Sequence, residues 1–162
     1  MAPSANNVAY TALINPAGSS PVLTRAQIWK ALLLKIRSAE TFVPGAIQST
    51  VVLSESVDPV SRNPVTEREV VFREGQRKVK EIVTAYEDCR VVFDQPDGST
   101  VSNIVSEGAD GELYLTYVFE WRHAGLSPEE LAKAREKERH MAKMAVEGTI
   151  TAMRELVKSN KI

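Results

Sequence analysis

Apolar and polar residues alternate in several short segments of the chain, and tight-turn motifs separate these segments. The turn motifs are Glu74-Gly75, Pro96-Asp97-Gly98 and Ala109-Asp110-Gly111, and each lies between runs rich in Val, Ile, Phe, Tyr and Thr. Such runs around glycine-containing turns are typical of antiparallel strands joined as hairpins. We expect strands at Val8–Ile14, Ala46–Glu55, Thr66–Arg73, Lys78–Tyr86, Arg90–Gln95, Ser99–Ser106 and Glu112–Trp121.

Two helices frame this block of strands. Each begins with a capping box, Thr24–Gln27 for the first helix and Ser127–Glu130 for the second, in which Pro128 takes the first helical position. In this motif the side chains of the cap and of the third helical residue bind each other's backbone N–H groups. Nothing interrupts the helical pattern from Pro128 to Lys158, so the second helix should be about 45 Å long.

The lengths of the turns predict which side chains share a face of the sheet. If the turns that end at Gly98 and Gly111 are three-residue loops, Asn103 pairs with Val91 on one side and with Tyr117 on the other. One face across three strands is then almost wholly apolar. It contains Val91, Phe93, Val101, Val105, Leu115, Tyr117 and Phe119, with Asn103 as a polar member.

The turn at Glu74-Gly75 places a charged pair, Arg68 and Glu81, on a second face that is otherwise apolar. Such a pair is unfavourable on an inward face unless it is fully hydrogen-bonded or meets a ligand or water. Two interpretations stay open for this pair, and equally for Asn103 with Tyr117. Each is either a satisfied structural pair or part of the polar lining of an apolar pocket.

The apolar arc of the last helix is unusually rich in small residues at its centre. In order around the helix it comprises Met144, Gly148, Met141, Ala152, Ala145, Leu156, Thr149, Ala142, Met153 and Val157. Small residues that face a concave sheet either leave a cavity or let the helix and the sheet approach closely. The helix alone does not decide between these two interpretations.

Composition indicates a single globular domain over residues 1–162, with 43% hydrophobic and 25% charged residues. The 20 basic and 21 acidic residues give a net charge of -1, which provides no support for nucleic-acid binding. No apolar run approaches the roughly 20 residues that a membrane-spanning helix needs. The first residues resemble no signal peptide, and we expect a cytoplasmic protein.

The sequence offers no pattern of metal ligands. His123 and His140 are the two histidines, Cys89 is the single cysteine, and none of them has metal-site spacing. We expect His140 on the exposed side of the last helix, and Cys89 next to acidic residues should be a poor nucleophile. We therefore expect neither a metal nor a cofactor.

The order of the elements resembles the helix-grip fold of the START and birch-pollen-allergen superfamily, also called SRPBCC. The segments Ile14–Pro16, Pro21–Trp29, Gly98–Asn103 and Ser106–Trp121 are similar to the AtaL-like family within it. This resemblance implies an α+β fold in which a curved antiparallel sheet of about seven strands wraps a long C-terminal helix around a hydrophobic cavity. Fungal members of the family sometimes lie beside secondary-metabolite genes, whereas the superfamily includes carriers, cyclases and protein-binding members.

Three functions follow as hypotheses. The first is binding of a hydrophobic, aromatic or polyketide-like small molecule between the sheet and the last helix. The second is a cofactor-independent cyclase or isomerase in the same pocket, with Glu81, Arg68 and Tyr117 as candidate catalytic residues. The third is a protein-interaction module, which a fully packed interior would favour; a homodimer is also open. The expected ligand-binding residues are Arg68, Glu81, Asn103, Leu115, Tyr117, Phe119, Met141, Met144, Ala145, Gly148, Thr149 and Ala152.

Overall fold

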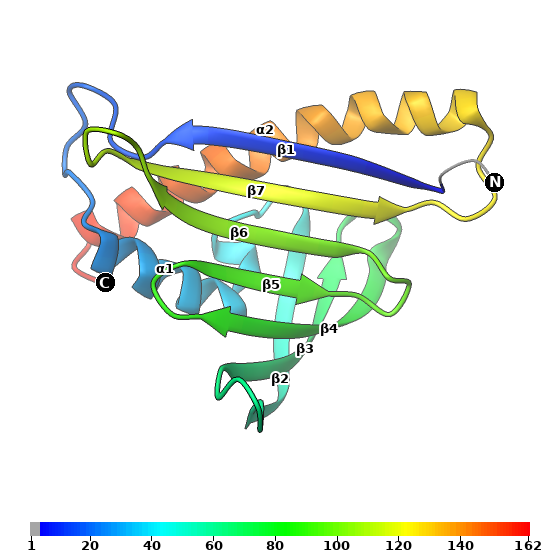
Figure 1. The fold of residues 1–162 in the computed structure, drawn as a ribbon, viewed down its shortest axis with the longest axis horizontal. Helices are drawn as coiled ribbons and strands as arrows, with labels where there is room; N and C mark the ends of the chain where they lie inside the picture. Colours follow the sequence, from blue (N-terminus) through cyan, green and yellow to red (C-terminus); the bar gives the residue numbers. More distant parts are fainter. Residues whose placement is uncertain (1–3) are drawn as a thin grey trace.

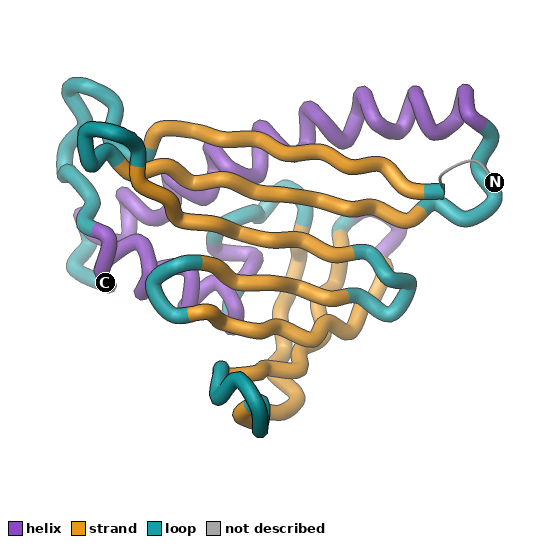
Figure 2. The backbone as a smooth tube through the Cα atoms, viewed as in Figure 1, coloured by secondary structure: helices purple, strands orange, loops and turns teal. Residues whose placement is uncertain are grey.

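The computed structural model describes residues 4–162 and consists of one antiparallel sheet with two long helices on the same side of it (Figures 1 and 2). The strands are β1 (Ala5–Leu13), β2 (Ile47–Val57), β3 (Pro64–Phe72), β4 (Arg77–Tyr86), β5 (Arg90–Asp94), β6 (Thr100–Glu107) and β7 (Leu113–Arg122). The helices are α1 (Arg25–Arg37) and α2 (Pro128–Lys158), with single 3₁₀ turns η1 (Ala39–Thr41) and η2 (Glu74–Gln76). Within the sheet the order is β1-β7-β6-β5-β4-β3-β2. This arrangement confirms the α+β helix-grip fold.

All seven expected strands are present, with ends that differ by at most three residues from the expected ones. The expected registers are also confirmed, since Asn103 pairs with Val91 and with Tyr117, and Arg68 lies opposite Glu81. Gly98 and Gly111 have φ angles of +87° and +79°, a left-handed conformation that glycine adopts without strain. These turns are therefore the reason why the registers could be predicted.

Both helices begin with the predicted capping boxes. The Thr24 hydroxyl accepts from the Gln27 N–H at 3.2 Å, and the Ser127 hydroxyl accepts from the Glu130 N–H at 3.2 Å. Helix α2 has 31 residues and runs along β1 and β7, on the edge of the sheet far from β2 (Figure 1). Within residues 4–162 no helix is both long and apolar enough to cross a membrane.

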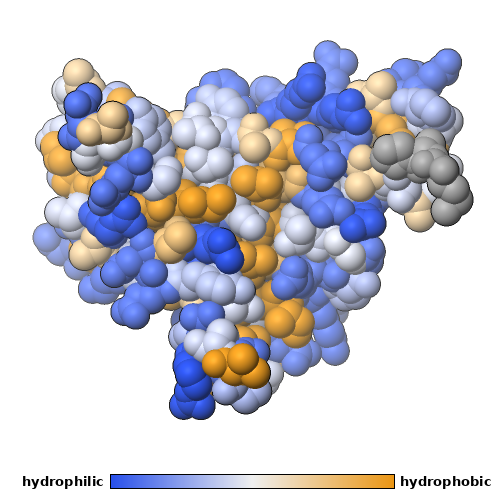
Figure 3. Space-filling view, viewed as in Figure 1, coloured by the Kyte–Doolittle hydropathy of each residue, from blue (hydrophilic) through white to orange (hydrophobic). Residues whose placement is uncertain are grey.

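The sheet curves, so that β2 and β3 turn away from the plane of β7 and β1 (Figure 1). Strand β2 has register shifts between Ile47 and Ser49 and between Val52 and Ser54, and such irregularities bend and twist a strand. The concave face carries the main apolar core, together with α1 and α2. The opposite face points to solvent, and Figure 3 shows apolar side chains among polar ones on the surface. Ile82 of β4 and Val118 of β7 are exposed.

Candidate functional site

A cavity of about 770 Å³ lies between α2, the concave face of the sheet and the segment 42–47 that joins η1 to β2. Apolar side chains from all three regions form most of its wall. They are Phe42, Val43, Ile47, Phe72, Phe93, Val101, Tyr117, Phe119, Trp121, Met141, Met144 and Ala145. This volume lies in the range of about 300–1,000 Å³ that is usual for pockets that bind small molecules.

Helix α2 presents two neighbouring stripes, one to the core and one to the cavity. Ala142, Val146, Thr149 and Met153 are buried against the sheet, at spacings of three and four residues that keep them on one side of a helix. The cavity stripe is rotated from the core stripe and consists of His140, Met141, Met144, Ala145 and Gly148. Met144 is 57% exposed, so this stripe runs from the interior to the cavity opening.

At Gly148 the small residue serves both purposes considered for the last helix, a cavity and close packing. It borders the cavity, and a Cβ atom added there would lie 3.6 Å from the backbone oxygen of Phe42, an ordinary van der Waals contact. A larger side chain would therefore push against the segment that follows η1. The small residue at 148 lets that segment approach α2, and the cavity lies beside this contact.

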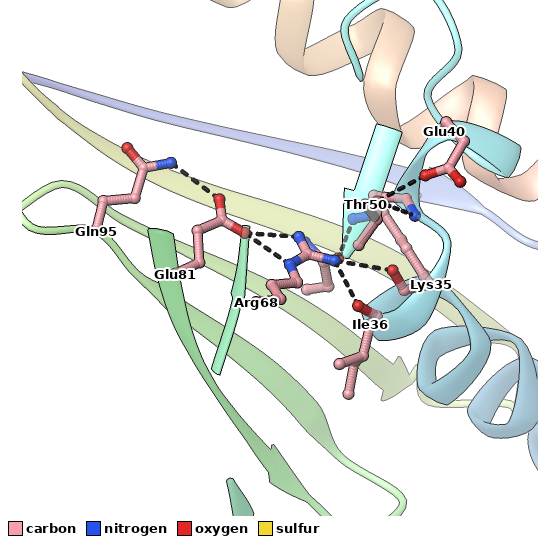
Figure 4. Close-up of polar contacts among 9 residues, drawn as sticks. Lys35, Ile36, Glu40, Thr50, Arg68, Glu81 and Gln95 are labelled. Atoms are coloured by element: carbon pink, nitrogen blue, oxygen red, sulfur yellow. Dashed lines mark hydrogen bonds and ion pairs between the residues drawn. The ribbon is translucent and has the colours of Figure 1, made fainter. Parts of the chain in front are cut away.

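Arg68 and Glu81 form a buried ion pair in the cavity wall, with exposed fractions of 2% and 3% (Figure 4). The Nε and Nη2 atoms of Arg68 lie 2.8 Å and 2.7 Å from Oε2 of Glu81, and Gln95 Nε2 donates to the other carboxylate oxygen at 3.1 Å. Arg68 Nη1 donates to the backbone oxygens of Lys35 and Ile36, each at 2.9 Å. Because the last carbonyls of a helix lack partners within it, Arg68 also caps the C-terminal end of α1.

Lys35 is the main functional candidate that the sequence analysis missed. It is 6% exposed and borders the cavity, and its Nζ donates to Asn103 Oδ1 at 2.9 Å. The same atom lies 4.8 Å from the ring centre of Phe93 and 5.0 Å from that of Tyr117. Burial, and secondly the positive charge of Arg68, lowers the pKa of Lys35 to about 7, while the Glu81 carboxylate acts in the opposite direction.

A helical projection of α1 would have found this lysine. Ile28, Ala31 and Leu32 are buried, and Lys35 follows Leu32 by three residues and Ala31 by four. It therefore lies on the buried stripe of α1. A charged residue on such a stripe is rare unless it is paired, and this was the available signal.

Asn103 and Tyr117 do not act as the single polar pair that their register suggested. Asn103 uses its Oδ1 to accept from Lys35, and its buried Nδ2 has no hydrogen-bond partner within residues 4–162. Tyr117 instead shares a 2.7 Å hydrogen bond with the Thr149 hydroxyl. Burial raises the pKa of the Tyr117 phenol, so this group is neutral at ordinary pH.

Eight of the twelve expected ligand-binding residues border the cavity. They are Arg68, Glu81, Tyr117, Phe119, Met141, Met144, Ala145 and Gly148. The other four are not among the residues that line the cavity. Leu115 and Ala152 pack into the apolar core, Asn103 is engaged by Lys35, and Thr149 is engaged by Tyr117.

Polar and charged side chains also line the cavity. His140 is exposed, as expected, but it also borders the cavity together with His123, Arg77 and Arg122. His123 contacts the carboxylate of the buried Glu138, which ties the end of β7 to α2. Within residues 4–162 no three or more His, Cys, Asp or Glu side chains lie close enough together to hold a metal ion.

Several solved structures share the fold. The di-domain aromatase/cyclase StfQ of the steffimycin biosynthetic pathway aligns with a TM-score of 0.61 at 10% identity, covering 97% of this chain and 52% of StfQ. The chain thus spans about half of that protein. Ara h 8.0201 aligns with a TM-score of 0.52 at 15% identity, covering 96% of this chain and 99% of its own. An AHSA1-like protein from Aeromonas hydrophila aligns with a TM-score of 0.53 at 12% identity, covering 94% of both chains.

Sequence comparison gives the family. No curated protein matches the chain by sequence. The family model described as AtaL, acetylaranotin biosynthesis cluster protein L, matches residues 8–160, which include every element that forms the cavity wall. The chain belongs to the AtaL family.

Proposed function

We propose that the protein binds an apolar small molecule of aromatic or polyketide-like character in the cavity between the sheet and α2. The observation that carries this proposal is the cavity itself, with a volume of about 770 Å³ and a wall of aromatic and aliphatic side chains. Burial of apolar ligand surface against such a wall contributes roughly 25 cal/mol per Å². An apolar compound of several rings therefore gains most of its affinity from the walls.

The polar groups in the wall give the ligand an orientation. Lys35, Arg68, Glu81 and Gln95 lie together in the cavity wall, while aromatic rings such as Phe93 and Phe119 form other parts of it. A few converging polar groups in an apolar pocket are typical of sites that select one oriented ligand. We expect a ligand with an apolar ring system and at least one oxygen-bearing end.

The relatives support a place in secondary metabolism. The family model carries the name of a biosynthesis-cluster protein, and StfQ is an aromatase/cyclase of a biosynthetic pathway. Because identity to StfQ is only 10%, this similarity supports the ligand class rather than the reaction. The interaction-module hypothesis predicted a filled interior, and a cavity of about 770 Å³ argues against it.

Native mass spectrometry of freshly purified protein tests the proposal. We expect a mass above that of the chain alone, and denaturing extraction should release an apolar compound. Where expression leaves the protein empty, the native spectrum is repeated after incubation with 2-naphthol and with the saturated, equally sized 2-decalol. Binding of neither compound would refute the proposal.

A further inference from the structure

We propose that Lys35 recognises a carbonyl group of the ligand by forming an imine between its Nζ and an aldehyde or ketone carbon. The inference rests on the proposed function, since it concerns the same cavity, and it narrows the ligand class to carbonyl compounds. Three observations carry it. The amine lies in the cavity wall, Asn103 holds it by a hydrogen bond, and no carboxylate within residues 4–162 forms an ion pair with it.

The amine is held in one place without being neutralised. Nζ donates to Asn103 Oδ1 at 2.9 Å and lies between the rings of Phe93 and Tyr117. Within residues 4–162 no carboxylate lies within 4 Å of it, because the Glu81 carboxylate is engaged by Arg68 and Gln95. A buried amine without an acidic partner favours its neutral form, which is the nucleophile.

Burial and the charge of Arg68 favour the neutral amine, and the Glu81 carboxylate opposes them only in part. Arg68 is the neighbouring positive charge, Glu81 is the opposing negative charge, and Tyr117 is a neutral phenol. With the pKa of Lys35 near 7, about half of its amine is neutral at pH 7. An exposed lysine with a pKa of about 10.4 is neutral to only about 0.04% at that pH.

The step balances without a cofactor or an oxidant. The nitrogen lone pair attacks the carbonyl carbon, the C=O π electrons move to the oxygen, and one amine proton is transferred to that oxygen through solvent. The resulting carbinolamine loses its hydroxyl group and the second amine proton as one water molecule. The products are a C=N bond and water, and the imine nitrogen can take up a proton.

Asn103 fixes the amine and is itself incompletely hydrogen-bonded. Its Nδ2 is buried and has no partner within residues 4–162, although an unmade hydrogen bond of this kind costs about 1–3 kcal/mol. Nδ2 and Oδ1 belong to the same amide, and Oδ1 already holds Lys35 Nζ. Because Asn103 does not line the cavity, its part in the proposal is to hold Nζ in place through Oδ1.

Reductive trapping tests the inference. The full chain is incubated at pH 7 with 2-naphthaldehyde and sodium cyanoborohydride, which converts an imine to a stable secondary amine, and the adduct is located by peptide mass mapping. We expect one adduct at Lys35, formed at least about tenfold faster than at Lys30, an exposed lysine of the same helix. Labelling spread over exposed lysines, with no excess at Lys35, would overturn the inference.

Two variants and one competitor make the result specific. Lys35→Met should remove the rapid adduct and Lys30→Met should keep it, provided that circular dichroism shows both to be folded. Excess 2-naphthol, which has the same rings without a carbonyl, should slow labelling of Lys35 in the wild type, and this measurement needs no variant. Lys35 labelling that is indifferent to the competitor would place the reactive amine outside the cavity.

Binding of 2-naphthol, followed through the fluorescence of Trp121 in the cavity wall, separates the two proposals. If 2-naphthol binds and 2-naphthaldehyde leaves Lys35 unlabelled, the imine inference is wrong and the binding function stands. If neither compound binds, both are wrong.

Discussion

At the scale of single residues, the site depends on a buried lysine that has no acidic partner. Lys35 is 6% exposed, and its single hydrogen-bond acceptor in the described structure is the amide oxygen of Asn103. The hydrophobic pattern of the strands did not lead to Lys35, because this residue lies in α1, where only the capping box was interpreted. Its burial depends on how α1 docks on β6, through long-range contacts that strand registers do not encode.

Lys35 should make the stability of the protein depend on pH. Its pKa is about 7 in the folded state and 10.5 in its ordinary state, so between these values the unfolded chain binds more protons than the folded one. Raising the pH through this window therefore stabilises the folded state, by about 1.4 kcal/mol per pH unit for one group. This is measured by denaturant unfolding of the wild type and of Lys35→Met from pH 6 to pH 10. The unfolding free energy of the variant minus that of the wild type should decrease as the pH rises above 7.

The exposed Lys30 of the same helix provides the control. Lys30→Met should differ from the wild type by a constant amount over the same pH range. If the unfolding free energies of Lys35→Met and the wild type also differed by a constant amount from pH 6 to pH 10, the lowered pKa of Lys35 would be contradicted.

At the scale of elements, the Arg68–Glu81 pair joins β3 and β4 to the end of α1. The register that pairs the two residues was predicted from the turn at Glu74-Gly75. The sequence did not predict the second role of Arg68, in which Nη1 binds the carbonyls of Lys35 and Ile36. The pair is thus satisfied within the protein, as the structural interpretation requires, and it also borders the cavity, as the functional interpretation requires.

Glu81→Gln should lower the free energy of unfolding by about 3–5 kcal/mol, because it leaves the buried Arg68 charge without its partner. Chemical denaturation measures this change. Glu69→Gln is the matched control, since Glu69 lies opposite the exposed Lys80 in the same ladder on the other face, where removal of a charge costs at most about 1 kcal/mol. If both substitutions lowered the free energy of unfolding equally, the buried Glu81 would contribute no more to stability than the surface residue Glu69.

This expectation also bears on the enzyme hypothesis, in which Glu81 moves a proton. Both Glu81 oxygens already accept hydrogen bonds, one from Arg68 and one from Gln95. A turnover assay of Glu81→Gln is informative only at temperatures where the variant is folded. Under those conditions the hypothesis predicts lost turnover with ligand affinity little changed.

At the scale of the whole molecule, the sequence predicted the fold more completely than the site. Alternation, glycine turns and capping boxes act locally, and they led to the strands, the registers and both helix starts. The AtaL-like resemblance is confirmed by the family match over residues 8–160. The cavity wall was predicted only where it lies on the sheet or on α2, because the segment 42–47 and the end of α1 reach it through the tertiary fold alone.

The central claim is that the cavity beside α2 is the binding site, and a titration with a cavity-filling variant tests it most directly. Ala145 borders the cavity, whereas Ala132 is exposed on the same helix, so Ala145→Phe and Ala132→Phe add the same ring inside and outside the site. Followed by tryptophan fluorescence, 2-naphthol should bind Ala145→Phe at least about tenfold more weakly than the wild type, a loss of about 1.4 kcal/mol. Ala132→Phe should bind 2-naphthol like the wild type. Unchanged affinity in a folded Ala145→Phe variant would show that the ligand binds elsewhere and would contradict the account.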